Sequence, residues 1–264
     1  MVDNIDNKQY LNLLAVIGFS GVVIDGLILH PDNEKVIFPL GSQIVVRNVL
    51  SRQDKFLRGH TNDITTMAIS NSWKYLASGQ KMASWVKADI IVWDLETLSL
   101  IHRFSIHKVV IQSLCFSFND NYLVSLGGAD DNNLIVWDVK TGKALCGNIA
   151  GREFVYQVKF FNQCDNKLVT CQNYGIGIWT VDYQNKKLIP LDVNFGNLKR
   201  EIVCMCIEPF DKFAFFGTKS GDILEVDLSN GVYKRIGPLK KLFPQGVSCM
   251  KLLPNSDLLV GTLE

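Results

Sequence analysis

An excess of positive charge, a long hydrophobic run and an export signal are all missing from this sequence, and each absence excludes a class of protein. The 27 Lys and Arg against 26 Asp and Glu leave a formal net charge of +1, whereas a surface that binds nucleic acid or membrane needs a clear basic excess. No apolar stretch reaches the roughly 18 residues of a membrane-spanning helix. Residues 1–14 lack the basic segment and apolar segment of a secretion signal. The sequence therefore predicts a cytoplasmic protein that binds neither nucleic acid nor membrane.

Cysteine pairs of the C-x-x-C type are absent as well. The seven cysteines are scattered through apolar runs, at positions 115, 146, 164, 171, 204, 206 and 249. Cys204 and Cys206 are two residues apart, which places both side chains on one face of a strand. We interpret all seven as reduced, small core residues of a cytosolic protein, in preference to a redox or metal-binding role.

One unit recurs along the chain. Leu57–Thr97 contains Gly59-His60, an apolar run, a polar turn, the segment LASGQ and Trp93-Asp94. The next unit repeats this order and ends in Trp137-Asp138. In the other units the position of this tryptophan, the tryptophan slot, is expected at Val46, Trp179 and Glu225. Successive slots are then separated by 42 to 47 residues. This period and the Trp-Asp pair are typical of WD repeats, in which each unit forms four short strands.

The predicted fold is all-β, a WD-repeat β-propeller with about five complete blades and part of a sixth, expected to come from a seven-bladed ring. An immunoglobulin-like sandwich would not repeat one motif in this way. Residues 1–264 are predicted to form this single incomplete propeller, as a piece of a longer protein. Leu11–Phe19 is expected to be the strand that an N-terminus lends to the last blade.

The repeated polar residues predict a hydrogen-bonded relay that satisfies buried groups within each blade, since an unpaired buried polar group costs about 1–3 kcal/mol. The relay joins a loop histidine, a strand hydroxyl, a loop aspartate and the tryptophan. In the second blade Lys87 occupies the place of the aspartate, with Asp89 as a possible substitute. The assigned members are His60, Ser78 and Trp93 in the second blade, and His107, Ser125, Asp131 and Trp137 in the third.

A Ser, a His and an Asp in one unit also suggest a hydrolase triad. That alternative needs an exposed nucleophile beside a base and an oxyanion hole, and no G-x-S-x-G segment is present. The same set recurs in degraded form along the chain, which favours a structural device. His102 and His107 fall on opposite faces of extended chain, and no HExxH occurs, so no metal site is predicted. The sequence predicts no catalytic residues, no cofactor and no small-molecule substrate.

Two loop insertions are the candidate partner contacts. The first, Gln80–Ala88, carries Lys81, Trp85 and Lys87, and the second, Leu191–Glu201, carries Phe195, Lys199 and Arg200. A third candidate is Gly237–Gly246. Aromatic residues and Arg dominate the energetics of protein interfaces. Trp85 and Phe195 could equally fold back over their own blades, and both readings stay open at this stage.

The sequence resembles the cilia- and flagella-associated WD-repeat proteins of doublet microtubules. The resemblance rests on the segments HPDNEKVIFPLG, KADIIVWD, YLVSLGGADDNNLIVWD, GNLKREIVCMCIE, GTKSGDILEVD and GVSCMKLLPNSDLLVGT. It implies the first of two tandem propellers in a protein inside the lumen of the axonemal doublet. There the protein would contact tubulin and other axonemal proteins and stabilise the doublet for motility.

The alternative hypothesis is a WD-repeat adaptor in another cytoplasmic multiprotein assembly. A tagged protein that resists detergent extraction from the axoneme would favour the ciliary hypothesis, and diffuse cytosolic signal would favour the adaptor. An enzyme is the least favoured of the three.

Overall fold

Apolar runs of period two become short antiparallel strands in the structure, a computed structural model that describes residues 18, 21–196 and 198–262. The first sheet, blade 1, contains β1 (Ile28–Leu29), β2 (Lys35–Leu40), β3 (Gln43–Asn48) and β4 (Asp54–Arg58). Blade 2 contains β5 (Ile64–Ile69), β6 (Tyr75–Gln80), β7 (Ile90–Asp94) and β8 (Ser99–Phe104). Blade 3 contains β9 (Ile111–Phe116), β10 (Tyr122–Gly127), β11 (Asn133–Asp138) and β12 (Lys143–Ile149).

The remaining strands repeat this arrangement. Blade 4 contains β13 (Val155–Phe160), β14 (Lys167–Gln172), β15 (Gly175–Asp182) and β16 (Lys187–Asp192). Blade 5 contains β17 (Ile202–Ile207), β18 (Phe213–Thr218), β19 (Ile223–Asp227) and β20 (Val232–Gly237). A sixth sheet contains only β21 (Val247–Leu252) and β22 (Leu258–Thr262). The prediction of an all-β propeller with five four-stranded blades and part of a sixth is confirmed.

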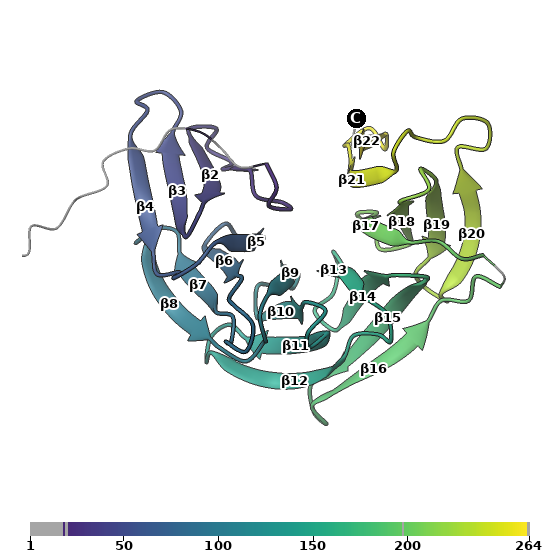
Figure 1. Cartoon of the computed structure of the whole chain (residues 1–264), viewed down its shortest axis with the longest axis horizontal. Coiled ribbons are helices and arrows are strands. Elements are labelled where there is room, and N and C mark those ends of the chain that lie inside the picture. The colour runs from purple at the N-terminus through teal and green to yellow at the C-terminus, as the bar shows by residue number, and fades with distance from the viewer. Residues whose placement is uncertain (1–17, 19–20, 197, 263–264) are drawn as a thin grey trace, which may run out of the picture.

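The sheets stand around a common axis, with β5, β9, β13 and β17 innermost and β8, β12, β16 and β20 outermost (Figure 1). The ring is open between blade 1 and the β21–β22 hairpin (Figure 1). On the inner side of the ring, Ile24 forms a parallel bridge with Thr66 of β5, so that the segment before β1 lies along the innermost strand of blade 2. The predicted lent strand, Leu11–Phe19, lies outside the described residues except for Gly18.

The hydrophobic core is divided into layers between neighbouring blades. One cluster joins blades 1 and 2 around Trp93, a second joins blades 2 and 3 around Trp137, and a third joins blades 3 and 4 around Trp179. A fourth, between blades 4 and 5, contains Phe216 and Val226. The tryptophans therefore mark successive seams of a radial stack.

The strand register corrects two of the expected tryptophan slots. Trp93 pairs with Leu76 and Trp137 with Leu123, in each case the second residue of the neighbouring strand. In blade 5 the second residue of β18 pairs with Val226, and in blade 1 the second residue of β2 pairs with Arg47. The expectations at Glu225 and Val46 are therefore wrong by one residue, a shift that turns a side chain to the opposite face of its strand.

A recurring carboxylate joins consecutive blades at their first turns. Asp120 of blade 3 accepts hydrogen bonds from the backbone N–H groups of Asn71 at 2.7 Å and Ser72 at 2.8 Å in blade 2. Asp165 accepts from the N–H of Asn119 at 2.8 Å in the same way. Asp211 accepts from the N–H groups of Asn162 and Gln163, both at 2.7 Å.

Candidate interaction surface

The strand order places every predicted partner contact on one rim of the propeller. Connections in an antiparallel sheet alternate between its two ends. The ends of the sheets that carry the β6–β7 loop (81–89), the β12–β13 loop (150–154), the β16–β17 loop (193–201) and the β20–β21 loop (238–246) therefore share one side. We call this side the loop rim. The opposite rim carries turns such as 70–74 and 208–212.

In blade 3 the four predicted relay members lie within hydrogen-bond distance of one another. The His107 Nδ1 is 3.0 Å from Asp131 Oδ2, and its Nε2 is 2.7 Å from Ser125 Oγ. The Trp137 indole N–H donates to the same Ser125 Oγ at 2.8 Å. Since a carboxylate oxygen accepts, Nδ1 donates to Asp131, and Nε2 accepts a hydrogen bond from the Ser125 hydroxyl. Ser125 and His107 are fully buried, so this hydroxyl is not presented to a substrate.

Asp131 reaches the histidine because Gly127 leaves room for it. A Cβ at Gly127 would lie 1.8 Å from Asp131 Oδ1. Burial raises the pKa of Asp131, but the hydrogen bonds from His107 and from the N–H groups of Lys108 and Asn133 outweigh it and lower the pKa overall. The carboxylate is therefore ionised and held in place, and it is not the solvated turn residue that its neighbour Asp130 is.

Blade 2 uses a different acceptor, which the sequence reasoning missed. The His60 Nδ1 lies 2.9 Å from Gln80 Oε1, and its Nε2 lies 2.7 Å from Ser78 Oγ, which also accepts from the Trp93 indole N–H at 2.8 Å. Gln80 ends β6 in the segment LASGQ, and its carboxamide fills the place of the missing aspartate. The expected substitute, Asp89, instead binds Arg103 and Ser105. Burial lowers the pKa of His60 to about 4, so this imidazole is neutral at pH 7.

In blade 5, where Leu198 stands at the histidine position four residues before the inner strand, an arginine pairs with the loop aspartate. The Arg200 Nε donates to Asp222 Oδ2 at 2.8 Å, and the Asp222 side chain is only 3% exposed. Asp222 also accepts from the Thr218 hydroxyl. Arg200 is thus placed as an internal ion-pair partner, because removing it would leave a buried carboxylate uncompensated.

The β6–β7 loop presents Trp85 to solvent. This side chain is 99% exposed and its backbone has a positive φ of 77°. The loop is fixed to the β8–β9 loop (105–110), which leads from blade 2 into blade 3: Ala88 N–H donates to His107 O at 2.9 Å, and Val109 N–H donates to Val86 O at 3.1 Å. Trp85 therefore projects from a loop that two backbone hydrogen bonds hold in place, and it does not fold back over its blade.

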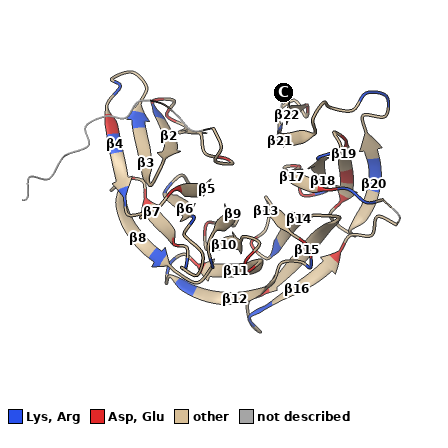
Figure 2. Cartoon of the chain, in the orientation of Figure 1, with Lys and Arg blue, Asp and Glu red and all other residues tan. Residues whose placement is uncertain are grey.

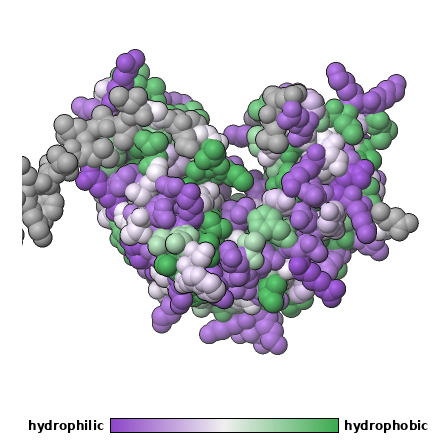
Figure 3. All heavy atoms as spheres, viewed as in Figure 1, coloured by the Kyte–Doolittle hydropathy of each residue, from purple (hydrophilic) through white to green (hydrophobic). Residues whose placement is uncertain are grey.

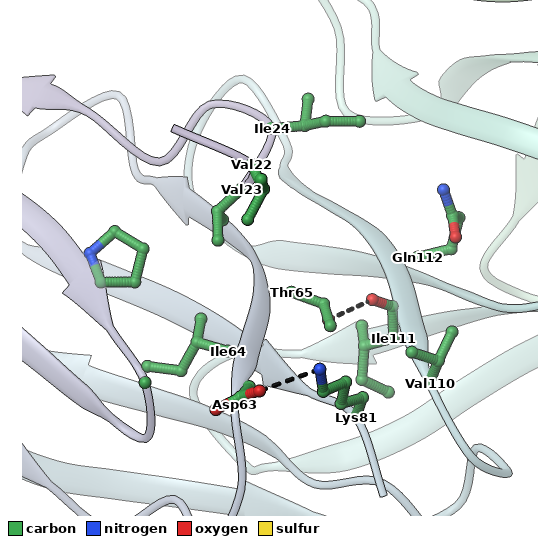
Figure 4. A pocket seen from close by; sticks show the side chains of 12 residues that line it. Val22, Val23, Ile24, Asp63, Ile64, Thr65, Lys81, Val110, Ile111 and Gln112 are labelled. Atoms are coloured by element: carbon green, nitrogen blue, oxygen red, sulfur yellow. Dashed lines mark hydrogen bonds and ion pairs between the residues drawn. The ribbon is translucent and has the colours of Figure 1, made fainter. Parts of the chain in front are cut away.

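The two lysines of this loop differ in whether an ion pair holds their side chains. Lys81 Nζ lies 2.8 Å from Asp63 Oδ2, beside a pocket of about 390 Å³ that is also lined by Ile24 and Ile111 (Figure 4). Lys87 is exposed, and none of the ion pairs formed by the described residues includes it.

In the β16–β17 loop, Phe195 folds back and Lys199 does not. The Phe195 ring packs edge-on against Tyr233 with centroids 5.9 Å apart and lies against the core between blades 4 and 5. Lys199 is exposed. Of the six predicted contacts, the structure thus leaves Lys81, Trp85, Lys87 and Lys199 exposed, with Lys81 in a surface ion pair, and holds Phe195 and Arg200 within the fold.

The β20–β21 loop adds an exposed apolar and basic tip. Leu239 is 85% exposed and Leu242 is 49% exposed, with Lys240 and Lys241 between them. Basic residues on this loop are visible beyond β20 (Figure 2). On the face shown in Figure 3, hydrophobic residues lie in separate patches among hydrophilic ones. The exposed hydrophobic side chains of the loop rim include Trp85 and Leu239.

The cysteines and possible ligand groups add no reactive cluster to this surface. All seven cysteines are free, and Cys146, Cys171 and Cys204 are buried. Burial raises the pKa of Cys146 to about 11 and that of Cys204 to about 12. Within residues 18, 21–196 and 198–262, no group of three or more His, Cys, Asp or Glu could hold a metal ion. The same described part of the chain has no helix long and apolar enough to cross a membrane.

The chain is similar to proteins from several organisms. Cilia- and flagella-associated protein 52 of Chlamydomonas reinhardtii is 44% identical over 252 residues, which are 95% of this chain and 41% of the relative. The Homo sapiens protein of the same name is 40% identical over 255 residues, 96% of this chain and 41% of the relative. The chain therefore spans about two fifths of the length of these relatives.

Solved structures share the fold. The structure of U3-55K superposes with a TM-score of 0.71 at 18% identity, covering 94% of this chain and 77% of that one. The WD40 repeats of RRP9 give the same TM-score and identity and cover 94% and 76%. The model of the family described as "Echinoderm microtubule-associated protein first beta-propeller" matches residues 53–263. By this match, which covers most of its length, the chain belongs to that β-propeller family.

Proposed function

We propose that this chain is a non-catalytic structural protein of cilia and flagella, which binds tubulin and other axonemal proteins and stabilises doublet microtubules for motility. The names of the relatives support a ciliary or flagellar role, and the family description names a microtubule-associated protein. Since the chain spans 41% of these relatives, a second propeller outside residues 1–264 belongs to the proposal.

The observation that carries the proposal is the rigid display of Trp85. An exposed tryptophan on a mobile loop would lose conformational freedom on binding, whereas one on a loop bonded to the neighbouring blade loses little. Tryptophan is also the residue type most enriched among the anchors of protein interfaces. The buried relay hydroxyls support a binding function in preference to catalysis.

Localisation tests the cellular part of the proposal. The tagged protein is expected in the axoneme of a ciliated cell and is expected to stay there after detergent extraction. Diffuse cytosolic signal that detergent removes would contradict the proposal and favour the adaptor alternative.

A matched pair of variants tests the contact surface. Trp85→Ala is expected to weaken co-sedimentation of the chain with microtubules about tenfold, as loss of an interface anchor does. Phe210→Ala is the control, because Phe210 is 80% exposed but lies in the 208–212 turn of the opposite rim. Equal binding by the two variants would contradict a contact through the loop rim.

A further inference from the structure

Blade 4 lacks the donor that its relay glutamine needs. Gln172 pairs with Val155 at the start of β13, just as Gln80 pairs with Ile64 at the start of β5. The residue four positions before the inner strand is His60 in blade 2 but Gly151 in blade 4. Gln80 Oε1 accepts from its histidine at 2.9 Å, whereas Gln172 Oε1 is buried without a hydrogen-bond partner.

A second unpartnered acceptor belongs to the next residue along the chain. Asn173 Oδ1 is also buried without a partner. Both residues line an open cleft of about 1420 Å³ on the loop rim. Buried polar atoms almost always have partners in folded proteins, so a ligand that brings donors into this cleft would satisfy two oxygens that the fold leaves unpaired.

The remaining walls of the cleft suit a long side chain. Trp179 and Pro190 line it on one side. The Trp179 indole N–H already donates to Thr170 Oγ1 at 2.9 Å and the residue is only 4% exposed, so Trp179 offers the cleft only a small part of its ring. Tyr174, which is 52% exposed, supplies a further aromatic surface.

The charged residues of the cleft are balanced. Glu153 and Asp192 line it together with Arg152 and Lys199, so a cation is not repelled by net charge. A carboxylate or phosphate ligand would bring only acceptors and would leave the two orphan oxygens unpaired. Because both unpaired groups are acceptors, the cleft favours a ligand with several hydrogen-bond donors.

We infer that this cleft receives the guanidinium group of an arginine side chain from a protein partner, which donates to Gln172 Oε1 and Asn173 Oδ1. Arginine presents five N–H donors in a planar fork and packs well on aromatic rings, so it matches both the acceptors and the ring surfaces. The arginine stands in for the histidine that Gly151 replaces. This site in blade 4 goes beyond the proposed microtubule contact, which rests on Trp85 in blade 2.

The blocked peptide Ac-Gly-Arg-Gly-NH2 tests the inference on the 264-residue chain. Titration is followed by the ¹⁵N–¹H resonance of the Trp179 indole, with the Trp93 indole as the internal reference. Two control peptides carry Glu or Leu in place of the arginine. The expected result is a saturable shift of the Trp179 indole resonance alone with the Arg peptide, and no such shift with the Glu or Leu peptide. A Trp179 resonance unmoved by the Arg peptide, or moved equally by all three peptides, would overturn the inference, as would preferential binding of the Glu peptide.

Two variants tie the binding to the orphan oxygens. Gly151→His restores the missing relay residue. The two atoms within 3.0 Å of its new Cβ, Oε1 at 1.7 Å and Cδ at 2.9 Å, both belong to the mobile end of Gln172. It is expected to fill the cleft and to weaken Arg-peptide binding about tenfold or more. Gln172→Leu removes the acceptor while keeping the volume, and it is expected to remove the preference of the chain for the Arg peptide over the Leu peptide. Thermal melting verifies that both variants fold.

Full Arg-peptide binding by folded Gly151→His would refute the site. Microtubule co-sedimentation of Gly151→His separates this result from the proposed function, because Trp85 is unaltered in that variant. Loss of peptide binding with intact co-sedimentation supports the arginine site alone.

Discussion

At the scale of single residues, Gln80 and Gln172 have the same position in their blades and different surroundings. Gln80 Oε1 accepts from His60 Nδ1 and from the Thr61 N–H at 3.1 Å, whereas Gln172 Oε1 has no partner. The contribution of a relay glutamine to stability therefore depends on the donor that faces it, and one substitution at each position measures this.

Gln80→Leu is expected to lower the free energy of unfolding by about 1–3 kcal/mol, because it leaves the buried His60 donor without an acceptor and also removes the acceptor of the Thr61 N–H. Gln172→Leu removes an acceptor that is already unpaired, so it is expected to leave stability unchanged or to raise it. Urea unfolding of both variants measures the difference. Equal destabilisation would show that the two glutamines act through packing alone.

His60 makes stability depend on pH in a defined direction. Burial lowers its pKa from 6.5 in the unfolded chain to about 4 in the fold, so the unfolded chain binds more protons between these values. The His60 contribution is fully present above pH 6.5 and is lost as pH falls toward 4, by about 3 kcal/mol at most. The measurement is the pH dependence of unfolding in the chain and in His60→Gln, whose curve is expected to fall less steeply over this window.

The relay shows how far single residues can be predicted from sequence. The spacing of His107, Ser125, Asp131 and Trp137 was enough to bring these four together, since they follow the complete repeat. Gln80 was missed because any side chain of suitable length and chemistry can fill that space. Arg200 was predicted as a partner contact because nothing in its local sequence reveals the buried Asp222 across the sheet.

At the scale of elements, the turn carboxylates hold blades together only where the preceding turn offers donors. The turn of blade 1 begins with Pro31, which has no N–H to donate. At the corresponding position of blade 2 the aspartate is replaced by Trp73, whose ring packs edge-on against His30 with centroids 5.6 Å apart. The seam between blades 1 and 2 is therefore joined by an aromatic contact in place of a carboxylate.

Asp120→Gly is expected to lower the free energy of unfolding by about 1–2 kcal/mol, because Asn71 and Ser72 lose a charged acceptor. Glycine retains the positive φ of 59° at this position, so backbone strain does not contribute. Asn33→Gly is the matched control, since Asn33 has the same turn position with a φ of 57° and no hydrogen bond among the described residues joins its side chain to another blade. A loss in the control as large as in Asp120→Gly would assign the effect to the turn itself.

Element boundaries also explain the two misplaced tryptophan slots. Counting from Trp93 and Trp137 places the slot only within one residue, because the connections between strands differ in length from blade to blade. The outer-strand bulge is not the cause, since it precedes the slot in the same way in blades 2, 3 and 5. Val226 is fully buried, and Arg47 lies 5.3 Å from the Phe38 ring centroid. The repeat period predicts the blade, whereas the register depends on pairing that the spacing does not record.

At the scale of the whole molecule, the open ring leaves a two-stranded sheet beside an unfilled sector (Figure 1). In the described chain β22 pairs with β21 alone, and its residue Leu259 is 58% exposed. An exposed strand edge with apolar side chains is a template for pairing with another chain. The isolated chain is therefore expected to self-associate through this edge as its concentration rises.

Leu259→Lys tests which surface drives that association. A charged side chain on an edge strand opposes pairing between chains, so the variant is expected to show a smaller rise of the sedimentation coefficient with concentration. Leu50→Lys is the control, because Leu50 is 83% exposed but lies in the turn between β3 and β4, where no strand can be added. If both substitutions reduced association equally, exposed leucine in general would drive it and the edge of β22 would have no special part.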